Sequence, residues 1–184
     1  MRRICLALVL LAGCGAAAAS ATPERSGTVQ RHTTGARQLA RLTGRVAGYQ
    51  HATWRWQRLM GVARTATEGR VLGTMRIENV EQALDLWRGR AARAAARAQH
   101  PPNLRTWLCI HRYEGSWSDS GAPYYGGLQM DVGFMQRYGS WLLRAKGTAD
   151  HWTPLEQIWT AEKARRSGRG FWPWPHTARM CGVL

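Results

Sequence analysis

The sequence CIHRYEGSW, residues 109–117, ends a helical pattern with a single carboxylate, Glu114, directly before Gly115. A glycine after the last periodic residue is a common C-terminal stop for a helix. Trp107, His111 and Glu114 are spaced by four and three residues, so we expect them on one face of that helix. The pattern therefore predicts a helix that presents one acid beside aromatic side chains.

A glutamate in this position has two interpretations. If aromatic neighbours exclude water, desolvation favours the neutral form of the carboxyl group. A neutral carboxyl can then act as a general acid on the leaving oxygen of a glycosidic bond. If Arg112 or His111 points at Glu114, the charged form is favoured and the residue is a surface acid or an ion-pair partner. The residues alone leave both interpretations open.

The flanking segments predict further short helices. Asn103 follows two prolines and is an N-cap candidate for the first helix. Residues 116–130, SWSDSGAPYYGGLQM, are rich in turn formers and predict a loop or a small hairpin. Residues 132–147 read as another helix that ends at a glycine.

The best-marked helix covers residues 153–168. It opens with Thr153, Pro154 and Glu156, which is a capping box with proline at the first helical position. GFWPWP, residues 170–175, follows as a rigid aromatic segment.

The N-terminal half is basic, within a chain whose net charge is +15. Apolar residues recur at helical spacing over residues 39–60 and 77–87, and an Ala/Arg tract follows until the prolines at 101–102. We expect a basic helical hairpin of two antiparallel helices over residues 37–100, with residues 22–36 as a polar, mobile tether. The arginines either serve an anionic surface such as lipid headgroups or wall polymers, or form a solvated face.

Residues 1–21 read as an export signal, with a short basic start, an apolar run and a small-residue patch. The apolar run is too short to span a bilayer. Its Leu-Ala-Gly-Cys sequence, ending at Cys14, resembles the lipobox of bacterial lipoproteins, which would anchor the protein at the outer face of the membrane. The alternative is cleavage after Ala21 and free secretion.

Export leaves Cys109 and Cys181 as the cysteines of the mature chain. An oxidising compartment and one remaining pair predict a disulfide that closes most of the C-terminal half. The alternative is two buried free thiols.

Four motifs in order, YEGSW, YYGGLQM, TPLEQIW and GFWPWP, followed by a last cysteine, resemble the resuscitation-promoting-factor group of transglycosylase-like domains. The resemblance covers residues 104–181. It implies a lysozyme-like fold, action on peptidoglycan, a Cys109–Cys181 disulfide and Glu114 as the catalytic acid. It also implies a glycan groove lined by Trp117, Tyr124, Tyr125, Gln129 and Gln157.

This sequence departs from the family pattern around the acid. Cys109 lies five residues before Glu114 rather than directly before it, and the link from Glu114 to Tyr124 is short. A shortened link favours an alternative in which the domain binds wall glycans without cleaving them.

Further residues are candidates for a role in the chemistry. Asp119 and Asp131 are the nearest second carboxylates, although loop aspartates more often form turns. Trp172 is a further candidate for stacking on sugar rings, with a place in the core as its alternative. The histidines lack paired ligand spacing, and we expect neither a metal nor a cofactor.

The sequence thus predicts a mainly α protein, with a lysozyme-like small α(+β) domain at residues 101–184 after the basic helices. We expect an exported glycosidase or lytic transglycosylase that cleaves the β-1,4 bond after N-acetylmuramic acid. Its expected partners are glycan strands and, through Cys14, the membrane. Nucleic-acid binding by the basic half is the third interpretation, which the export signal disfavours.

Overall fold

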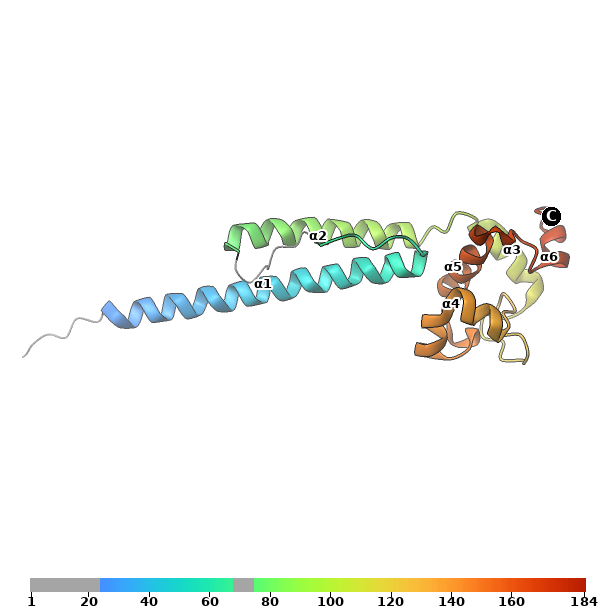
Figure 1. The fold of residues 1–184 in the computed structure, drawn as a ribbon, viewed down its shortest axis with the longest axis horizontal. Helices are drawn as coiled ribbons and strands as arrows, with labels where there is room; N and C mark the ends of the chain where they lie inside the picture. Colours follow the sequence, from blue (N-terminus) through green and yellow to red (C-terminus); the bar gives the residue numbers. More distant parts are fainter. Residues whose placement is uncertain (1–23, 68–74) are drawn as a thin grey trace, which may run out of the picture. The chain divides into compact units, whose positions relative to one another are not determined.

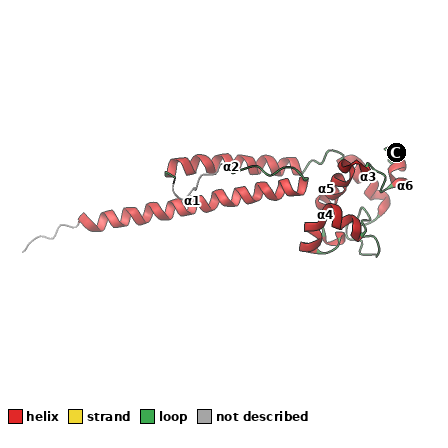
Figure 2. Ribbon diagram, viewed as in Figure 1, coloured by secondary structure: helices red, strands yellow, loops and turns green. Residues whose placement is uncertain are grey.

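The computed structural model describes residues 24–67 and 75–184, and their side chains from residue 34 onward. The described chain is mainly helical, which confirms the expected fold class at this level (Figures 1 and 2). The β-bridge found among these residues pairs Tyr125 with Met130. In chain order the helices are α1 (Glu24–Met60), α2 (Ile77–Ala98), α3 (Leu104–Glu114), α4 (Val132–Lys146), η2 (Ala149–His151), α5 (Pro154–Ala164), η3 (Arg165–Arg169) and α6 (Pro175–Met180).

The chain divides into two compact units, Met1–Arg37 and Gln38–Leu184. In the first unit α1 already begins at Glu24, so the predicted tether at residues 22–36 was wrong from residue 24 onward. The sequence has no proline between Glu24 and Met60. Each of the two glycines in residues 24–36 costs a helix only about 1 kcal/mol and does not by itself end one.

The predicted export segment 1–21, with Cys14, lies outside the described residues. Within residues 24–67 and 75–184, none of the helices has both the length and the apolar character that a membrane span needs.

In the second unit, α1 and α2 lie side by side and run in the same direction (Figure 1). Their contacts advance together toward the C-terminal end of each helix. The residues that cluster are, in order, Val46 with Val80, Trp54 with Trp87, and Met60 with Ala98.

The prediction of an antiparallel hairpin was therefore wrong. The segment after α1 turns back along the helix, because the Trp54 indole donates to the Thr65 carbonyl at 2.9 Å and the Thr65 amide donates to the Gln57 side chain at 3.0 Å. An extended chain covers about 3.3 Å per residue. Residues 61–76 are thus long enough to return along the roughly 33 Å of a helix the length of α2.

Helices α3 to α6 enclose a separate hydrophobic core. Fully or almost fully buried indoles fill it, from Trp107 in α3, Trp152 before α5 and Trp174 before α6. The Cys109–Cys181 disulfide joins α3 to the end of α6 and confirms the predicted pairing.

Helix ends follow the sequence in part. The capping box is confirmed: Thr153 Oγ1 accepts from the Glu156 amide at 3.3 Å and the Glu156 carboxylate accepts from the Thr153 amide at 2.8 Å. Asn103 precedes α3 but its side chain does not cap the helix. α5 ends at Ala164 and continues as the π-turn η3, and α6 was not expected from the sequence.

The Asn103 amide instead contacts a buried acid, Glu162 of α5, at 3.1 Å. Glu162 also accepts from the Trp107 indole at 2.9 Å and from Arg165 at 2.8 Å, and it is fully buried. Burial raises the pKa of Glu162, but hydrogen bonds from Arg165, Trp107 and Asn103 outweigh it and hold the pKa below its usual range. This network fixes the start of α3 against α5.

The ends of the two parallel helices contact α5 and the turn η3 that follows it. The Trp159 indole donates to the Ala98 carbonyl at 2.7 Å, and the Arg166 guanidinium donates to the Met60 carbonyl. Lys163 lies against Gly61, where burial, followed by the charges of Arg166 and Arg58, lowers the lysine pKa from 10.5 to about 8. The Lys163 ammonium group is thus held near two guanidinium groups at a contact from which much of the water is excluded.

Lys163→Met is expected to raise the free energy of unfolding at pH 7 by up to about 3 kcal/mol, since each pKa unit corresponds to about 1.4 kcal/mol. The folded pKa is depressed, so the destabilisation is complete below about pH 8 and disappears as pH rises toward 10.5. Urea unfolding of the wild type and of Lys163→Met from pH 7 to 10 measures the difference between their free energies of unfolding, which should become smaller as pH rises. Lys146→Met, at the exposed Lys146–Glu156 pair, is the control; a gap for Lys163→Met that does not change with pH contradicts the argument.

Candidate functional site

Glu114 lies at the C-terminal end of α3 and is half-buried. Its Oε1 accepts a hydrogen bond from Thr177 Oγ1 of α6 at 2.6 Å. The same hydroxyl lies 3.4 Å from the Trp174 carbonyl, a second acceptor. The acid is thus held by one neutral hydroxyl, and no ion pair to Glu114 is found among the described residues.

His111, one turn earlier, points elsewhere. Its Nδ1 lies 3.1 Å from the Gly127 carbonyl, so Nδ1 carries the proton and donates it. Its ring stacks on Trp117 with centroids 3.8 Å apart. His111 therefore supports the loop after α3 rather than pairing with the acid.

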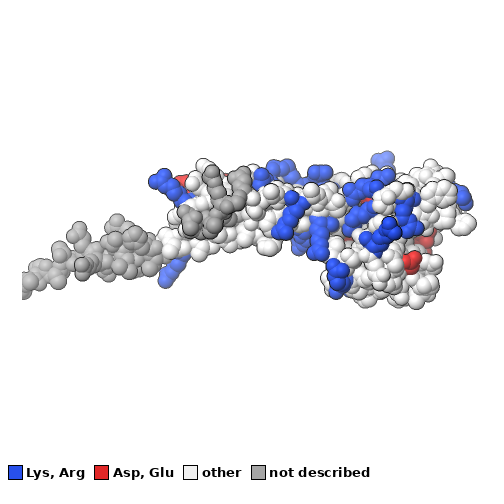
Figure 3. Space-filling view, viewed as in Figure 1, with Lys and Arg blue, Asp and Glu red and all other residues white. Residues whose placement is uncertain are grey.

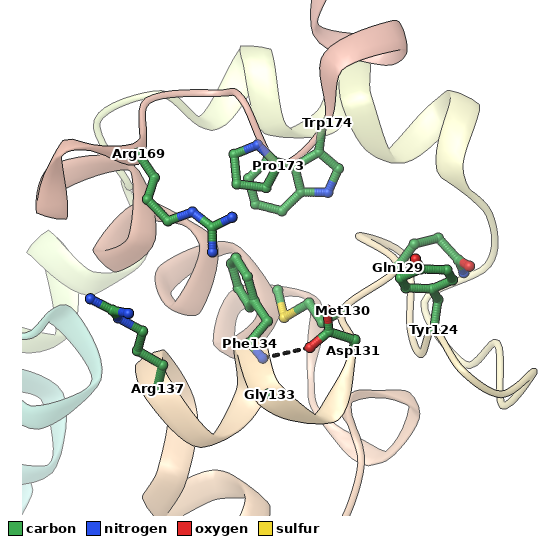
Figure 4. Close-up of a pocket in the computed structure, with 10 residues that line it drawn as sticks. All are labelled: Tyr124, Gln129, Met130, Asp131, Gly133, Phe134, Arg137, Arg169, Pro173 and Trp174. Carbon is green, nitrogen blue, oxygen red and sulfur yellow. Dashed lines mark hydrogen bonds between the residues drawn. The ribbon is translucent and has the colours of Figure 1, made fainter.

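A groove of about 420 Å³ lies between the start of α4 and the segment that precedes α6 (Figure 4). Its volume falls in the range typical of small-ligand sites. Aromatic side chains, two arginines and one acid form its walls. The lining residues are Tyr124, Gln129, Met130, Asp131, Gly133, Phe134, Arg137, Arg169, Pro173 and Trp174.

Glu114 lies beside this groove rather than in its lining. Thr177 connects it to Trp174, and a Cβ on Gly115 would lie 3.4 Å from the Gln129 amide nitrogen. Gln129 lines the groove on the side of Tyr124 in Figure 4, and its contact with Gly115 places the end of α3, which carries Glu114, on that side. The arginines lie at the opposite end in Figure 4.

The loop at this end is tightly tied. Gln129 has a positive φ of 46°, a conformation that costs a residue with a side chain of order 1 kcal/mol. The side-chain nitrogen Nε2 of Gln129 donates to Asp119 Oδ2 at 2.8 Å and to the Gly126 carbonyl at 3.0 Å. Asp119 Oδ1 accepts from the Gly121 amide, which makes Asp119 a turn former. Backbone strain of this kind concentrates at binding sites.

The glycine pair of YYGGLQM is required by close packing. Gly126 has a φ of 71°, and a Cβ there would lie 2.5 Å from Gln157 Oε1. A Cβ on Gly127 would lie 2.5 Å from His111 Nδ1 and 2.7 Å from the Trp117 ring. Only glycine lets the loop close on the His111–Trp117 stack.

The prediction that Gln157 lines the glycan groove was wrong. Its side chain is fully buried, and its Nε2 donates toward the carbonyls of Trp117, Ala149 and Trp152 at 2.8, 2.8 and 3.1 Å. The Gln157 side-chain amide therefore binds the loop that contains Trp117 to α5, and its buried Nε2 does not face a ligand.

The other predicted residues divide between the groove and the core. Tyr124 and Gln129 line the groove, and Tyr124 is half exposed. Trp117 and Tyr125 pack against the core and lie outside the lining of this groove, and their role in binding glycan stays a prediction. Trp172 exposes 64% of its surface, away from the core.

Asp131 lines the groove but has a structural role. Its Oδ1 accepts from the Phe134 amide at the start of α4, as an N-cap. Both candidate second carboxylates thus serve the backbone.

Sequence reasoning missed Thr177, Arg137, Arg169, Phe134 and Trp174. A signal existed for Thr177: it lies four residues before Cys181, as Glu114 lies five after Cys109, so the predicted disulfide already brought the two close. No spacing in the sequence connects Arg137 with Arg169. In the described part of the chain no group of three His, Cys, Asp or Glu side chains could hold a metal ion, and the expectation of a metal-free site stays a prediction.

Comparison with models of known protein families and with curated proteins finds no match to this sequence.

Gly127→Ala is expected to lower the free energy of unfolding by about 1–3 kcal/mol, because the added methyl overlaps the His111 and Trp117 rings. Gly48→Ala is the matched control: its Cβ meets open space in α1, and it should stabilise by about 0.5–1 kcal/mol. Urea denaturation measures both. Opposite signs are expected, and a stabilising Gly127→Ala would contradict the packing described.

Proposed function

We propose that residues 101–184 form a lysozyme-like domain of the transglycosylase-like group that cleaves the β-1,4 bond after N-acetylmuramic acid in peptidoglycan. The observation that carries this proposal is Glu114, half-buried at a helix end, held by Thr177, and placed at the end of an aromatic groove. The proposal also agrees with the order along the sequence of four motifs, YEGSW, YYGGLQM, TPLEQIW and GFWPWP.

The groove suits a sugar chain. Tyr124 exposes half its surface there, and the edges of Phe134 and Trp174 form the walls (Figure 4). Apolar faces of sugar rings pack on such aromatic surfaces, while the polar loop around Gln129 can bond hydroxyl or acetamido groups.

Thr177 suits a carboxyl group that changes its protonation state. Its hydroxyl donates to the Glu114 carboxylate at 2.6 Å. When Glu114 is protonated on Oε2, the same hydroxyl can continue to donate to Oε1, which leaves the Oε2 proton free for a leaving oxygen. One side chain can therefore orient the acid in both halves of a cycle.

In that cycle, Glu114 donates a proton to the leaving glycosidic oxygen as the bond between that oxygen and the anomeric carbon breaks. The carboxylate then accepts the proton of the sugar's own 6-hydroxyl, whose oxygen bonds to the anomeric carbon and leaves an anhydro end. This route needs one carboxylate. It is favoured over a two-carboxylate hydrolysis because Asp119 and Asp131 are used in turns and caps.

A second candidate is glycan binding without cleavage. Glu114 lies beside the groove and not in its lining, and its link to Tyr124 is short, so a strand could occupy the groove out of reach of the acid. Both candidates place the protein outside the cell, by export and through lipidation of Cys14, a setting with which the disulfide is compatible.

Glu114→Gln is expected to reduce the release of anhydro-muropeptides from purified cell wall at least 100-fold, the usual contribution of a general acid. Mass spectrometry of the soluble products measures it, with thermal unfolding to show that the fold is kept. Glu81→Gln, at an exposed acid of α2, is the control and should retain full activity.

Equal release by the wild type and Glu114→Gln would overturn the catalytic role. Binding of cell wall without any release by the wild type would favour the second candidate.

A further inference from the structure

The end of the groove farthest from Glu114 is strongly basic. Arg137 of α4 and Arg169 at the end of η3 both line it, and Figure 4 shows both side chains on this side of the groove. Both are exposed, and neither is in an ion pair among the residues that the structure describes. Arg169 lies 6.0 Å from the Phe134 ring, which holds its guanidinium over the groove wall.

The two charges act on the same small region. The pKa of Tyr138 is lowered, first by the hydrogen bond from Ser167, against an opposing effect of burial, and further by Arg169 and Arg137. Asp131 is the one acid in the groove's lining, and its carboxylate caps the positive start of α4. The remaining charge at this end is positive. Figure 3 shows that basic side chains outnumber acidic ones on the face in view.

We propose that Arg137 and Arg169 bind an oxyanion carried by the glycan, a carboxylate or a phosphate, while the neighbouring aromatic walls hold a sugar ring. This rests on the proposed function and narrows its substrate to anionic glycans. Guanidinium groups match the planar, two-oxygen geometry of carboxylates and phosphates. Two of them from separate elements, aimed at one end of an open groove, would select a charged strand over a neutral one.

Two sources could supply the oxyanion. Peptidoglycan carries carboxylates on its peptide stems, and on those lactyl groups to which no stem is attached, and phosphate occurs in anionic wall polymers. The test therefore uses four ligands: a tetrasaccharide with peptide stems, the same glycan without stems, the neutral N-acetylglucosamine tetramer, and polyglycerol phosphate.

The full oxidised chain carrying Glu114→Gln, which prevents turnover, is titrated with each ligand in a calorimeter. Adding Arg137→Gln and Arg169→Gln together is expected to weaken binding of the anionic glycans at least tenfold, and of the neutral tetramer less than twofold. Arg137→Lys with Arg169→Lys should recover part of the loss. Arg144→Gln, an exposed arginine of α4 outside the groove, should change nothing.

Each outcome is decisive. A loss for the stem-bearing glycan points to stem carboxylates, a loss for the stem-free glycan to lactyl carboxylates, and a loss for polyglycerol phosphate to phosphate; any of these, alone or together, supports the proposal. An equal effect on neutral and anionic ligands, or none on any, overturns it while leaving the glycan groove in place. Absence of binding to all four ligands by the chain with both arginines present would overturn both this inference and the proposed function.

Discussion

The covalent contact between α3 and α6 is the constraint on which the candidate site depends. The Cys109–Cys181 disulfide joins positions 72 residues apart, and chain-entropy arguments assign such a link about 4 kcal/mol of stability. Because it ties the two helices with opposite directions, the residue five after Cys109 meets the residue four before Cys181. That is how Thr177 reaches Glu114 at 2.6 Å.

A second constraint closes the loop between α3 and α4. Gly126 and Gly127 bring the backbone so near Gln157 and the His111 ring that any Cβ would overlap them. The Gln157 amide then holds the Trp117 carbonyl at 2.8 Å. Gln157, which the sequence suggested as a ligand contact, thus fixes the position of the loop. The groove lies beside the loop in this position.

Features set by local chemistry were predictable, and those set by distant contacts were not. The Thr153 capping box and the end of α3 at Gly115 depend on neighbouring residues, and the structure agrees with both. The parallel course of α1 and α2 depends on where Thr65 bonds, and helical periodicity carries no direction. Gln157 was expected in the groove because the family resemblance implied it, and the burial of a polar amide leaves no pattern in a sequence that would have corrected this.

The groove separates the neutral surroundings of Glu114 from the positive charges of Arg137 and Arg169, which would disturb the acid if they lay beside it. A cation near a carboxyl group favours its charged form, which would oppose the transfer of a proton to a glycosidic oxygen. Thr177, a neutral donor, holds Glu114 at one end, and Arg137 and Arg169 lie at the other. In the function proposed above, an anionic strand would therefore be attracted over the length of the groove without the attracting charges lying against the acid, and the aromatic walls between them would supply binding that does not depend on charge.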